Sequence, residues 1–260
     1  MNSSSSQLPG VLNVGICGLG TVGRGTLELL RINASEIERR LGSTLVISHA
    51  VTRTLDANCK ALLDSCGVNQ SGTDPFAVVK DPEVRILVET MGGFDPAFEV
   101  VSQALANGKH VVTANKALIA ERGNQLFPIA EQHNVNLAYE SSVAGGIPII
   151  KVLREGLAGN QIDWLAGIIN GTGNFIMTEM AAKQRHFDDV LKQAQELGYA
   201  EADPTLDIDG TDAAHKLTIM GSIVFGIPLQ FDQTYTEGIS NITPEDISYA
   251  DELGYCIKHL

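Results

Sequence analysis

The sequence predicts an α/β protein with a parallel sheet, followed by a second domain of the α+β class. Through the first half of the chain, short runs of β-branched and other apolar residues alternate with segments of helical period. That alternation is typical of parallel strands joined by helical crossovers. A glycine-rich turn directly follows the first apolar run, and after about residue 148 the segments become mostly helical.

The first domain is expected to span residues 11–147 and to contain five strands joined by helices. Each predicted strand is a short apolar run, and these runs lie at residues 11–17, 43–53, 84–90, 109–114 and 135–141. Apolar residues at helical spacing, together with Asp-Pro and Asn-Gly boundaries, predict helices over about 21–40, 95–108 and 116–134.

The glycines and proline of AGGIPI, residues 144–149, predict a hinge before a second domain at 148–260. That domain is expected to begin with a short helix in KVLREGLAG, and residues 163–171 read as a strand. Three further helices are predicted in NFIMTEMAAKQ, FDDVLKQAQELG and GTDAAHKLTIMGSIVFG.

Composition narrows the class of protein. The chain has 260 residues, of which 44% are hydrophobic, so it can bury a large core. Its formal net charge of −13 argues against a nucleic-acid binder, which needs a basic surface.

No apolar stretch reaches the roughly 18 residues of a membrane span. Residues 1–10 are expected to form a disordered tail and do not have the pattern of a signal peptide. Four cysteines without CxxC or zinc spacing predict cytoplasmic thiols, with Cys17 buried in a strand.

Gly18, Gly20 and Gly23 form a G-x-G-x-x-G pattern between the first predicted strand and the first predicted helix. In a Rossmann-type domain one glycine permits the tight turn, one lets the backbone approach a pyrophosphate, and one lets the helix pack on the strand. The helix N-terminus then offers free N–H groups to the phosphates. The alternative is a tight turn without a ligand. We predict a dinucleotide site that also includes Thr21, Val22 and Thr90.

The end of the second strand bears on the choice of cofactor. NAD-binding domains usually place a carboxylate there for the ribose hydroxyls. This chain has Arg53 instead, and the next carboxylate is Asp56. An arginine can contact a 2′-phosphate, so the sequence favours NADP, with NAD possible. The alternative is that Arg53 is an ordinary surface residue.

Lys116 follows the strand that ends in Val111-Val112-Thr113. In an open parallel sheet, ligands bind at the carboxyl ends of the strands. A lysine in the first turn of a helix also opposes the helix dipole, which favours a functional role over a solvated one. We therefore count Lys116 as a cofactor- and substrate-binding candidate.

The segment EADPTLDIDGTDAAHK, residues 201–216, holds five carboxylates before one lysine. If 210–226 is helical, Asp212 and Lys216 lie on the same stripe as the apolar residues that face the core. A buried pair costs desolvation, and proteins tolerate that cost mostly at sites. The alternative is an exposed pair, which would be unremarkable. We predict that Lys216 moves a proton, with Asp212 as its partner.

The other carboxylates of this segment divide into two groups. Glu201 and Asp207 precede the helix and could hold a substrate ammonium and hydroxyl, which suits a small amino alcohol or amino aldehyde. Asp203 begins an Asp-Pro turn and Asp209 begins an Asp-Gly turn, so both are expected to be turn residues.

These motifs together resemble the homoserine dehydrogenase family. The matching segments are GLGTVG (18–23), TANK (113–116), ESSVAGGIPII (140–150), GIINGTGNFI (167–176) and ELGYAEADPTLDIDGTDAAHKL (196–217). The resemblance implies an NAD(P)-dependent oxidoreductase that interconverts L-homoserine and L-aspartate 4-semialdehyde, in the biosynthesis of threonine, methionine and isoleucine. It assigns Lys216 and Asp212 to catalysis, and Glu201, Asp207 and Lys116 to substrate binding.

The resemblance also implies a cation site, an oligomeric state and a location. Main-chain oxygens of a short loop would bind a monovalent cation, with sodium expected, at Glu140, Val143, Gly145 and Ile147. The family is typically a homodimer through its second domain, and the expected location is the cytoplasm.

Family members continue beyond the equivalent of DELGYCIKHL, so the resemblance implies a chain truncated at its C-terminus. The alternative function is then a catalytically incompetent dinucleotide-binding fragment. A further alternative, an aldehyde-oxidising semialdehyde dehydrogenase, requires a nucleophilic cysteine. Neither Cys17 nor Cys256 lies in a suitable motif.

Overall fold

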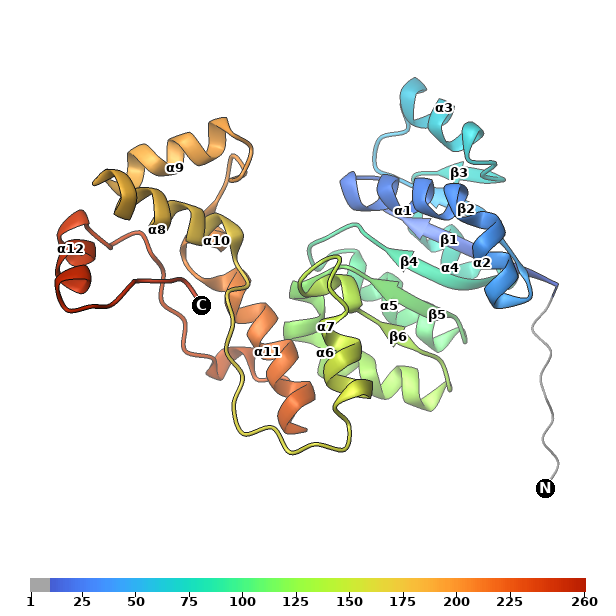
Figure 1. Ribbon diagram of the computed structural model, residues 1–260. Coiled ribbons are helices and arrows are strands. Elements are labelled where there is room, and N and C mark those ends of the chain that lie inside the picture. Colours follow the sequence, from blue (N-terminus) through green and yellow to red (C-terminus); the bar gives the residue numbers. More distant parts are fainter. Residues whose placement is uncertain (1–9) are drawn as a thin grey trace. The chain divides into compact units, whose positions relative to one another are not determined.

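The computed structural model describes residues 10–260, and the chain divides into two compact units after Pro148 (Figure 1). Each unit has a core of its own and is described separately. Of the expected N-terminal tail, residues 1–9 lie outside the described residues. Among residues 10–260, no helix has the length and apolar character needed to cross a bilayer.

The first unit is built on a six-stranded parallel sheet in the order β3-β2-β1-β4-β5-β6. This confirms the predicted α/β class. The strand order changes direction between β1 and β4, and the crevice outside the carboxyl ends of strands at such a point is where ligands bind. The strands are β1 (Val11–Cys17), β2 (Thr44–Val51), β3 (Gln70–Gly72), β4 (Val84–Glu89), β5 (His110–Thr113) and β6 (Leu137–Ala138).

Helices connect these strands, as the alternating pattern predicted (Figure 1). Capping residues mark several of their starts: the Asp56, Asp74 and Asn115 side chains each accept a backbone N–H of their own helix. The helices are α1 (Thr21–Ile32), α2 (Ala34–Leu41), α3 (Ala57–Ser65), α4 (Pro75–Lys80), α5 (Ala97–Ala106) and α6 (Lys116–Gln132), with a 3₁₀ turn, η1, at Glu140–Ser142.

A hydrophobic cluster fixes the central strands against α1 and α3. Ile16 of β1 and Leu27 of α1 are completely buried, and Leu63 of α3 packs in the same cluster. Cys17 ends β1 and is also fully buried, as predicted. Burial, together with the negative charges of Glu89 and Asp74, raises the pKa of the Cys17 thiol to about 12. That thiol is therefore not a nucleophile at neutral pH.

The first unit differs from the sequence-based expectation in several places. Residues 57–80, where no element was expected, form α3, the sixth strand β3 and α4. The single helix expected over 21–40 is two helices, because the chain leaves helical geometry at Asn33, whose side chain donates to Leu29 O at 3.0 Å. An asparagine side chain can form hydrogen bonds with nearby backbone groups that would otherwise bond within the helix. The spacing of apolar residues gives no sign of this competition. The strand expected over 135–141 is paired only at Leu137–Ala138, and the chain then enters η1.

The regular elements of the second unit are helices around a core that includes Ile176, Met180 and Val190. They are α7 (Ile149–Lys151), a π turn η2 (Val152–Gly156), α8 (Gly171–Lys183), α9 (Phe187–Glu196), α10 (Thr205–Ile208), α11 (Thr211–Phe225), a 3₁₀ turn η3 (Phe231–Gln233) and α12 (Pro244–Glu252). The three long helices predicted from the apolar period are α8, α9 and α11.

The prediction of a strand over 163–171 is wrong. Residues 160–170 form no regular element, and the large apolar side chains Trp164 and Ile168 are 75% and 56% exposed. A strand needs a hydrogen-bonded neighbour, and residues 149–260 contain no other strand with which this segment could pair. Its composition favours a strand, but no partner is present to form one.

Candidate active site

The glycine turn between β1 and α1 has the close contacts that its three glycines permit. Gly18 has φ +104°, and a Cβ there would lie 2.4 Å from Thr90 O. A Cβ on Gly23 would lie 1.9 Å from Gly18 O, so only glycine allows the helix to start this near the turn. The Thr90 hydroxyl donates to Gly18 O at 2.7 Å and holds the end of β4 against the turn.

At the N-terminus of α1, no side chain caps the backbone N–H groups that a ligand would bind. Gly20 is the N-cap, and the first turn carries no acidic residue. Such an end attracts phosphate through its N–H groups and its dipole. A cavity of about 410 Å³ opens beside it, and its lining includes Gly18, Gly20, Arg24, Arg53 and Thr90. Arg24 was not predicted, although it directly follows the third glycine.

A second cavity, of about 280 Å³, lies along α1 and the sheet. Val22 lines this one, together with Thr113 and Ala114 of the segment that leads to Lys116. Thr90 lines both cavities. Of the residues predicted for the cofactor, five line these cavities, namely Gly18, Gly20, Val22, Arg53 and Thr90, whereas Thr21, Gly23 and Lys116 line neither. The cavity near Arg53 is the more polar of the two, and the one near Val22 is mainly apolar. These residues fit an elongated ligand with a charged part and a flat apolar part.

Glu89, at the end of β4, is a buried carboxylate that the sequence reasoning did not single out. It is fully buried and accepts from Thr113 Oγ1 at 2.5 Å, Met91 N at 2.7 Å and Gly92 N at 3.2 Å. Charge-assisted bonds of this kind can compensate the cost of burying a carboxylate. Glu89 thereby ties the loop after β4 to the end of β5.

Lys116 is the first residue of α6 and is half-buried. Its neighbour Asn115 caps that helix by accepting from Leu118 N at 3.1 Å, and donates from Nδ2 to Gly93 O at 2.6 Å. The Thr113 hydroxyl accepts from Asn115 N. The position of Lys116 is therefore set by a network that begins at Glu89.

In the second unit, Asp212 and Lys216 form the contact expected from their spacing on α11. Lys216 Nζ donates to Asp212 Oδ2 at 2.5 Å, and the two side chains are only 16% and 8% exposed. Lys216 Nζ also donates to Ile169 O at 2.8 Å. The exposed pair considered as an alternative is thus not what the structure shows. Asp212 sits in the first turn of α11, where the helix dipole favours a carboxylate.

Asn170 joins this pair to Asp207. Its side-chain Nδ2 donates to Asp207 Oδ1 at 2.7 Å and to Asp212 Oδ2 at 2.9 Å. Asn170 is 2% exposed and was missed from the sequence. It lies inside the motif GIINGTGNFI, and the position directly before a Gly-x-Gly helix start was the available signal. Asp207, Asn170, Asp212 and Lys216 therefore form one connected cluster within the second unit.

The remaining carboxylates of 201–209 behave differently. Glu201 is exposed, and its main-chain oxygen accepts from Gln195 Nε2 at 3.2 Å. Asp203 accepts from the Thr205 hydroxyl at 2.6 Å, and this bond lowers the Asp203 pKa. Asp209 accepts from Thr211 N at 2.8 Å. The prediction that Asp203 and Asp209 are turn residues is confirmed.

A buried histidine lies near the cluster. His259 is 7% exposed, and its backbone N–H donates to Asn174 Oδ1 while its carbonyl accepts from Asn174 Nδ2. A Cβ on Gly173 would lie 2.3 Å from His259 Nδ1, so this glycine makes room for the ring. Burial lowers the His259 pKa, while the charges of Asp212 and Asp207 raise it and that of Lys216 lowers it.

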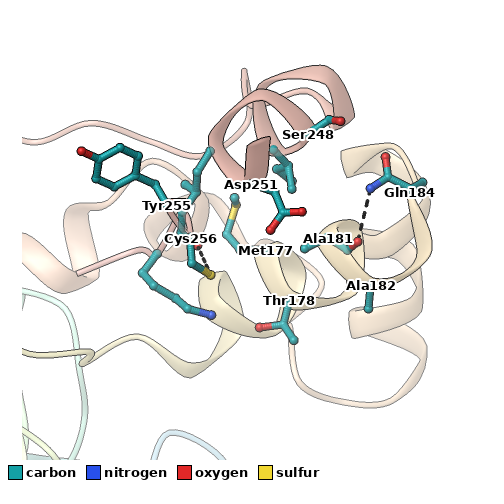
Figure 2. Close-up of a pocket in the computed structure, with 12 residues that line it drawn as sticks. Met177, Thr178, Ala181, Ala182, Gln184, Ser248, Asp251, Tyr255 and Cys256 are labelled. Atoms are coloured by element: carbon teal, nitrogen blue, oxygen red, sulfur yellow. Dashed lines mark hydrogen bonds between the residues drawn. The ribbon is translucent and has the colours of Figure 1, made fainter. Parts of the chain in front are cut away.

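A separate cavity of about 380 Å³ lies between α8, α12 and residues 255–258 (Figure 2). Met177 and Asp251 line it from the two helices, and the Cys256 thiol donates to Ile257 O at 3.9 Å at its edge. None of the predicted site residues lines this cavity. The candidate catalytic residues of the second unit therefore lie elsewhere.

The segment proposed for a cation, residues 140–147, consists of the 3₁₀ turn η1 and the tight irregular loop that follows it in the first unit. Ala144 and Gly146 have φ of 48° and 86°, and Ile147 N donates to Ala144 O at 2.8 Å. Val143 is fully buried, whereas Ile147 is 62% exposed. Among the residues that the structure describes, no cluster of three or more His, Cys, Asp or Glu side chains is suited to a metal ion.

Comparison with known proteins gives the same family for both units. Residues 18–140 match the homoserine dehydrogenase NAD binding domain, and residues 148–260 match homoserine dehydrogenase itself. A homoserine dehydrogenase of Pseudomonas aeruginosa is 57% identical over 249 residues, which are 96% of this chain and 56% of that protein.

Two solved structures are similar in fold as well as in sequence. A homoserine dehydrogenase from Thiobacillus denitrificans is 60% identical with a TM-score of 0.90, over 95% of this chain and 57% of that one. A hyperthermophilic archaeal homoserine dehydrogenase in complex with NADPH is 31% identical with a TM-score of 0.74, over 89% and 75%. The chain thus spans a little over half of the two longer relatives and three quarters of the archaeal one. It belongs to the homoserine dehydrogenase family.

Proposed function

We propose that this chain carries the NAD(P)-dependent interconversion of L-homoserine and L-aspartate 4-semialdehyde, a step in the supply of threonine, methionine and isoleucine. The observation that carries the proposal is Lys216, a lysine only 16% exposed that is held at 2.5 Å from Asp212, which Asn170 links to Asp207. A lysine–carboxylate pair with so little access to water costs desolvation free energy, and proteins tolerate that cost mostly at functional sites.

The proposed chemistry needs one hydride and one proton to move. A nicotinamide cofactor held at the glycine turn would supply a hydride acceptor for C4 of homoserine, and a hydride donor in the reverse direction. When the alcohol is oxidised, Lys216 must first release one proton to solvent, and its neutral amine then takes the hydroxyl proton; when the aldehyde is reduced, its ammonium gives a proton to the aldehyde oxygen. Asp212 Oδ2 and Ile169 O hold the Lys216 nitrogen in a fixed position for both steps.

The carboxylates supply recognition of an amino acid. Asp207 is positioned by Asn170, and Glu201 lies exposed six residues before it. We propose that these two groups bind the substrate ammonium and hydroxyl. Lys116, at the start of α6 in the first unit, is proposed to bind both cofactor and substrate.

The direct experiment is to mix the chain with L-homoserine and NADP and follow the absorbance of the reduced cofactor. We expect reduction with L-homoserine and a large loss of activity with N-acetyl-L-homoserine, which lacks the ammonium. No reduction with L-homoserine would reject the proposal. The alternative of a dinucleotide-binding protein without catalysis predicts cofactor binding by calorimetry and no turnover.

Arg53 is proposed to select NADP by contacting its 2′-phosphate, because it lines the polar cavity beside the glycine turn. Of the related proteins, the archaeal one was solved with NADPH. Replacing Arg53 by alanine is expected to raise KM for NADP by about 10- to 100-fold, the value of one or two charged hydrogen bonds, and to leave KM for NAD nearly unchanged. Arg31→Ala, an exposed arginine at the other end of α1, is the matched control. A preference for NAD in the unsubstituted chain would contradict this role.

We propose a sodium ion at the loop 140–147, coordinated mainly by main-chain oxygens of Glu140, Val143, Gly145 and Ile147. The loop's left-handed residues and buried Val143 support an ordered backbone there. Sodium chloride is expected to raise the melting temperature above that in choline chloride at equal ionic strength, because an ion bound only to the folded state stabilises it. Equal melting temperatures in the two salts would remove the basis for the site.

A homodimer and a cytoplasmic location stay predictions from the resemblance. Sedimentation analysis and cell fractionation test them, and a monomer at micromolar concentration or a membrane-bound pool would contradict them.

A further inference from the structure

Asn170 donates both hydrogens of one side-chain amide to two different carboxylates. We infer that Asn170 is a positioning residue, which fixes the spacing and orientation of the Asp207 and Asp212 carboxylates. The inference rests on the proposed function for its effect on turnover, but its effect on the two carboxylates can be measured without any activity.

The orientation of the Asn170 amide follows from its neighbours. Oδ1 accepts from Gly173 N at 2.7 Å, the N-cap bond of α8. The opposite end of the amide must then be the NH₂ group, which has two hydrogens to give. One goes to Asp207 at 2.7 Å and the other to Asp212 at 2.9 Å. All three bonds are directional, so the amide plane cannot rotate without breaking one of them.

The charges of this cluster explain why an amide is needed there. Two carboxylates that share one neighbour repel each other, and in such pairs one group tends to hold a proton. A neutral donor between them gives each a hydrogen bond that favours its ionised form. Asp212 Oδ2 accepts from Lys216 as well, so the amide acts on the same oxygen that holds the lysine.

The support of Asn170 is rigid. It starts α8, and the first turn of that helix packs against His259 at Gly173, where no Cβ could fit. Asn174, one turn further, holds the backbone of His259 by two hydrogen bonds. Asn170 is therefore anchored on one side and binds the carboxylates on the other.

The substitution N170D distinguishes the two roles of Asn170, which caps α8 and positions the two carboxylates. An aspartate has the same size and caps a helix as well as asparagine does. It replaces the donating NH₂ group by an oxygen that faces two carboxylates. We expect kcat/KM for homoserine to fall by about 100-fold or more at neutral pH, as two charge-assisted hydrogen bonds are lost. KM for NADP should not change.

The pH dependence of N170D activity distinguishes a positioning role of Asn170 from a purely structural one. N170D places a third carboxyl group beside Asp207 and Asp212. Because the three negative charges repel one another, this cluster should take up a proton at higher pH than the two carboxylates of the unsubstituted chain do. The protonated carboxyl group can then donate a hydrogen bond to a neighbouring carboxylate. The ratio of mutant to unsubstituted activity should therefore rise as pH falls. Lys216 and His259 also face the cluster, and the added carboxylate acts on both of them, so the pH profile is read together with the titration of the carboxyl groups themselves.

T243A is the matched control, because it removes the N-cap of α12 in the same unit without touching the cluster. It should cost stability and keep the activity profile. A second readout is carbon NMR titration of Asp207 and Asp212 with labelled aspartate, which N170D should move to higher pH. Parallel pH profiles and unmoved titrations would overturn the inference. If the unsubstituted chain does not oxidise homoserine, the proposed function fails, and the titrations alone decide the role of Asn170.

Discussion

Replacing Lys216 by alanine is expected to lower kcat for homoserine oxidation by about 10²- to 10⁴-fold, the usual contribution of a positioned acid–base group. The Lys216 side chain is 16% exposed, and its Nζ donates to Asp212 Oδ2 and to Ile169 O. The dissociation constant for NADP should stay near that of the unsubstituted chain, since the cofactor residues belong to the first unit. Steady-state kinetics and calorimetry measure the two quantities.

Two further variants sharpen this prediction. Lys192→Ala removes an exposed lysine on α9 and should leave turnover unchanged. A small primary amine added to K216A should restore part of the rate, because it can carry the proton that Lys216 carried. Near-normal turnover of K216A would refute the role of Lys216. A loss without amine rescue, accompanied by a collapsed fold in circular dichroism, would show that the lysine is needed for structure.

Replacing Gly23 by alanine is expected to abolish measurable NADP binding and to destabilise the chain by about 1–3 kcal/mol, the cost of overpacking. The new Cβ would lie 1.9 Å from Gly18 O and 2.9 Å from the Thr90 hydroxyl. Neither the glycine turn nor the end of β4 can keep its position, and these two segments line the polar cavity. Calorimetric titration with NADP and chemical denaturation report the two effects.

Gly25 of the same helix provides the control. A Cβ there meets no heavy atom within 4 Å, so Gly25→Ala should keep NADP affinity and stabilise α1 by about 0.5–1 kcal/mol. Normal NADP affinity in G23A would show that the turn does not hold the cofactor. Equal losses in both variants would point to a general weakness of α1.

Local patterns were sufficient to predict several parts of this structure. The first glycine turn needs only a strand before it and a helix after it, and both were readable from short apolar runs. The contact between Asp212 and Lys216 follows from their spacing of four residues on one helix. Asp203 and Asp209 were predicted to be turn residues because Asp-Pro and Asp-Gly pairs favour turns, and each side chain indeed accepts a hydrogen bond from the residue two positions later.

Contacts between distant segments could not be predicted in the same way. Asn170 meets Asp207 and Asp212 across 37 and 42 residues, and Glu89 meets Thr113 across 24. A single sequence contains no local signal for such pairs. Residues 163–171 show the opposite case, since their composition favours a strand but pairing depends on a neighbour that residues 149–260 do not provide.

The most direct test of the central claim is to follow the hydrogen that moves. The chain would be incubated with NADP and L-homoserine carrying deuterium on C4, and the reduced cofactor analysed by mass spectrometry. The proposed reaction predicts that deuterium appears on the nicotinamide, and that K216A produces it far more slowly. Reduced cofactor without deuterium, or no reduced cofactor from the unsubstituted chain, would contradict the proposed function.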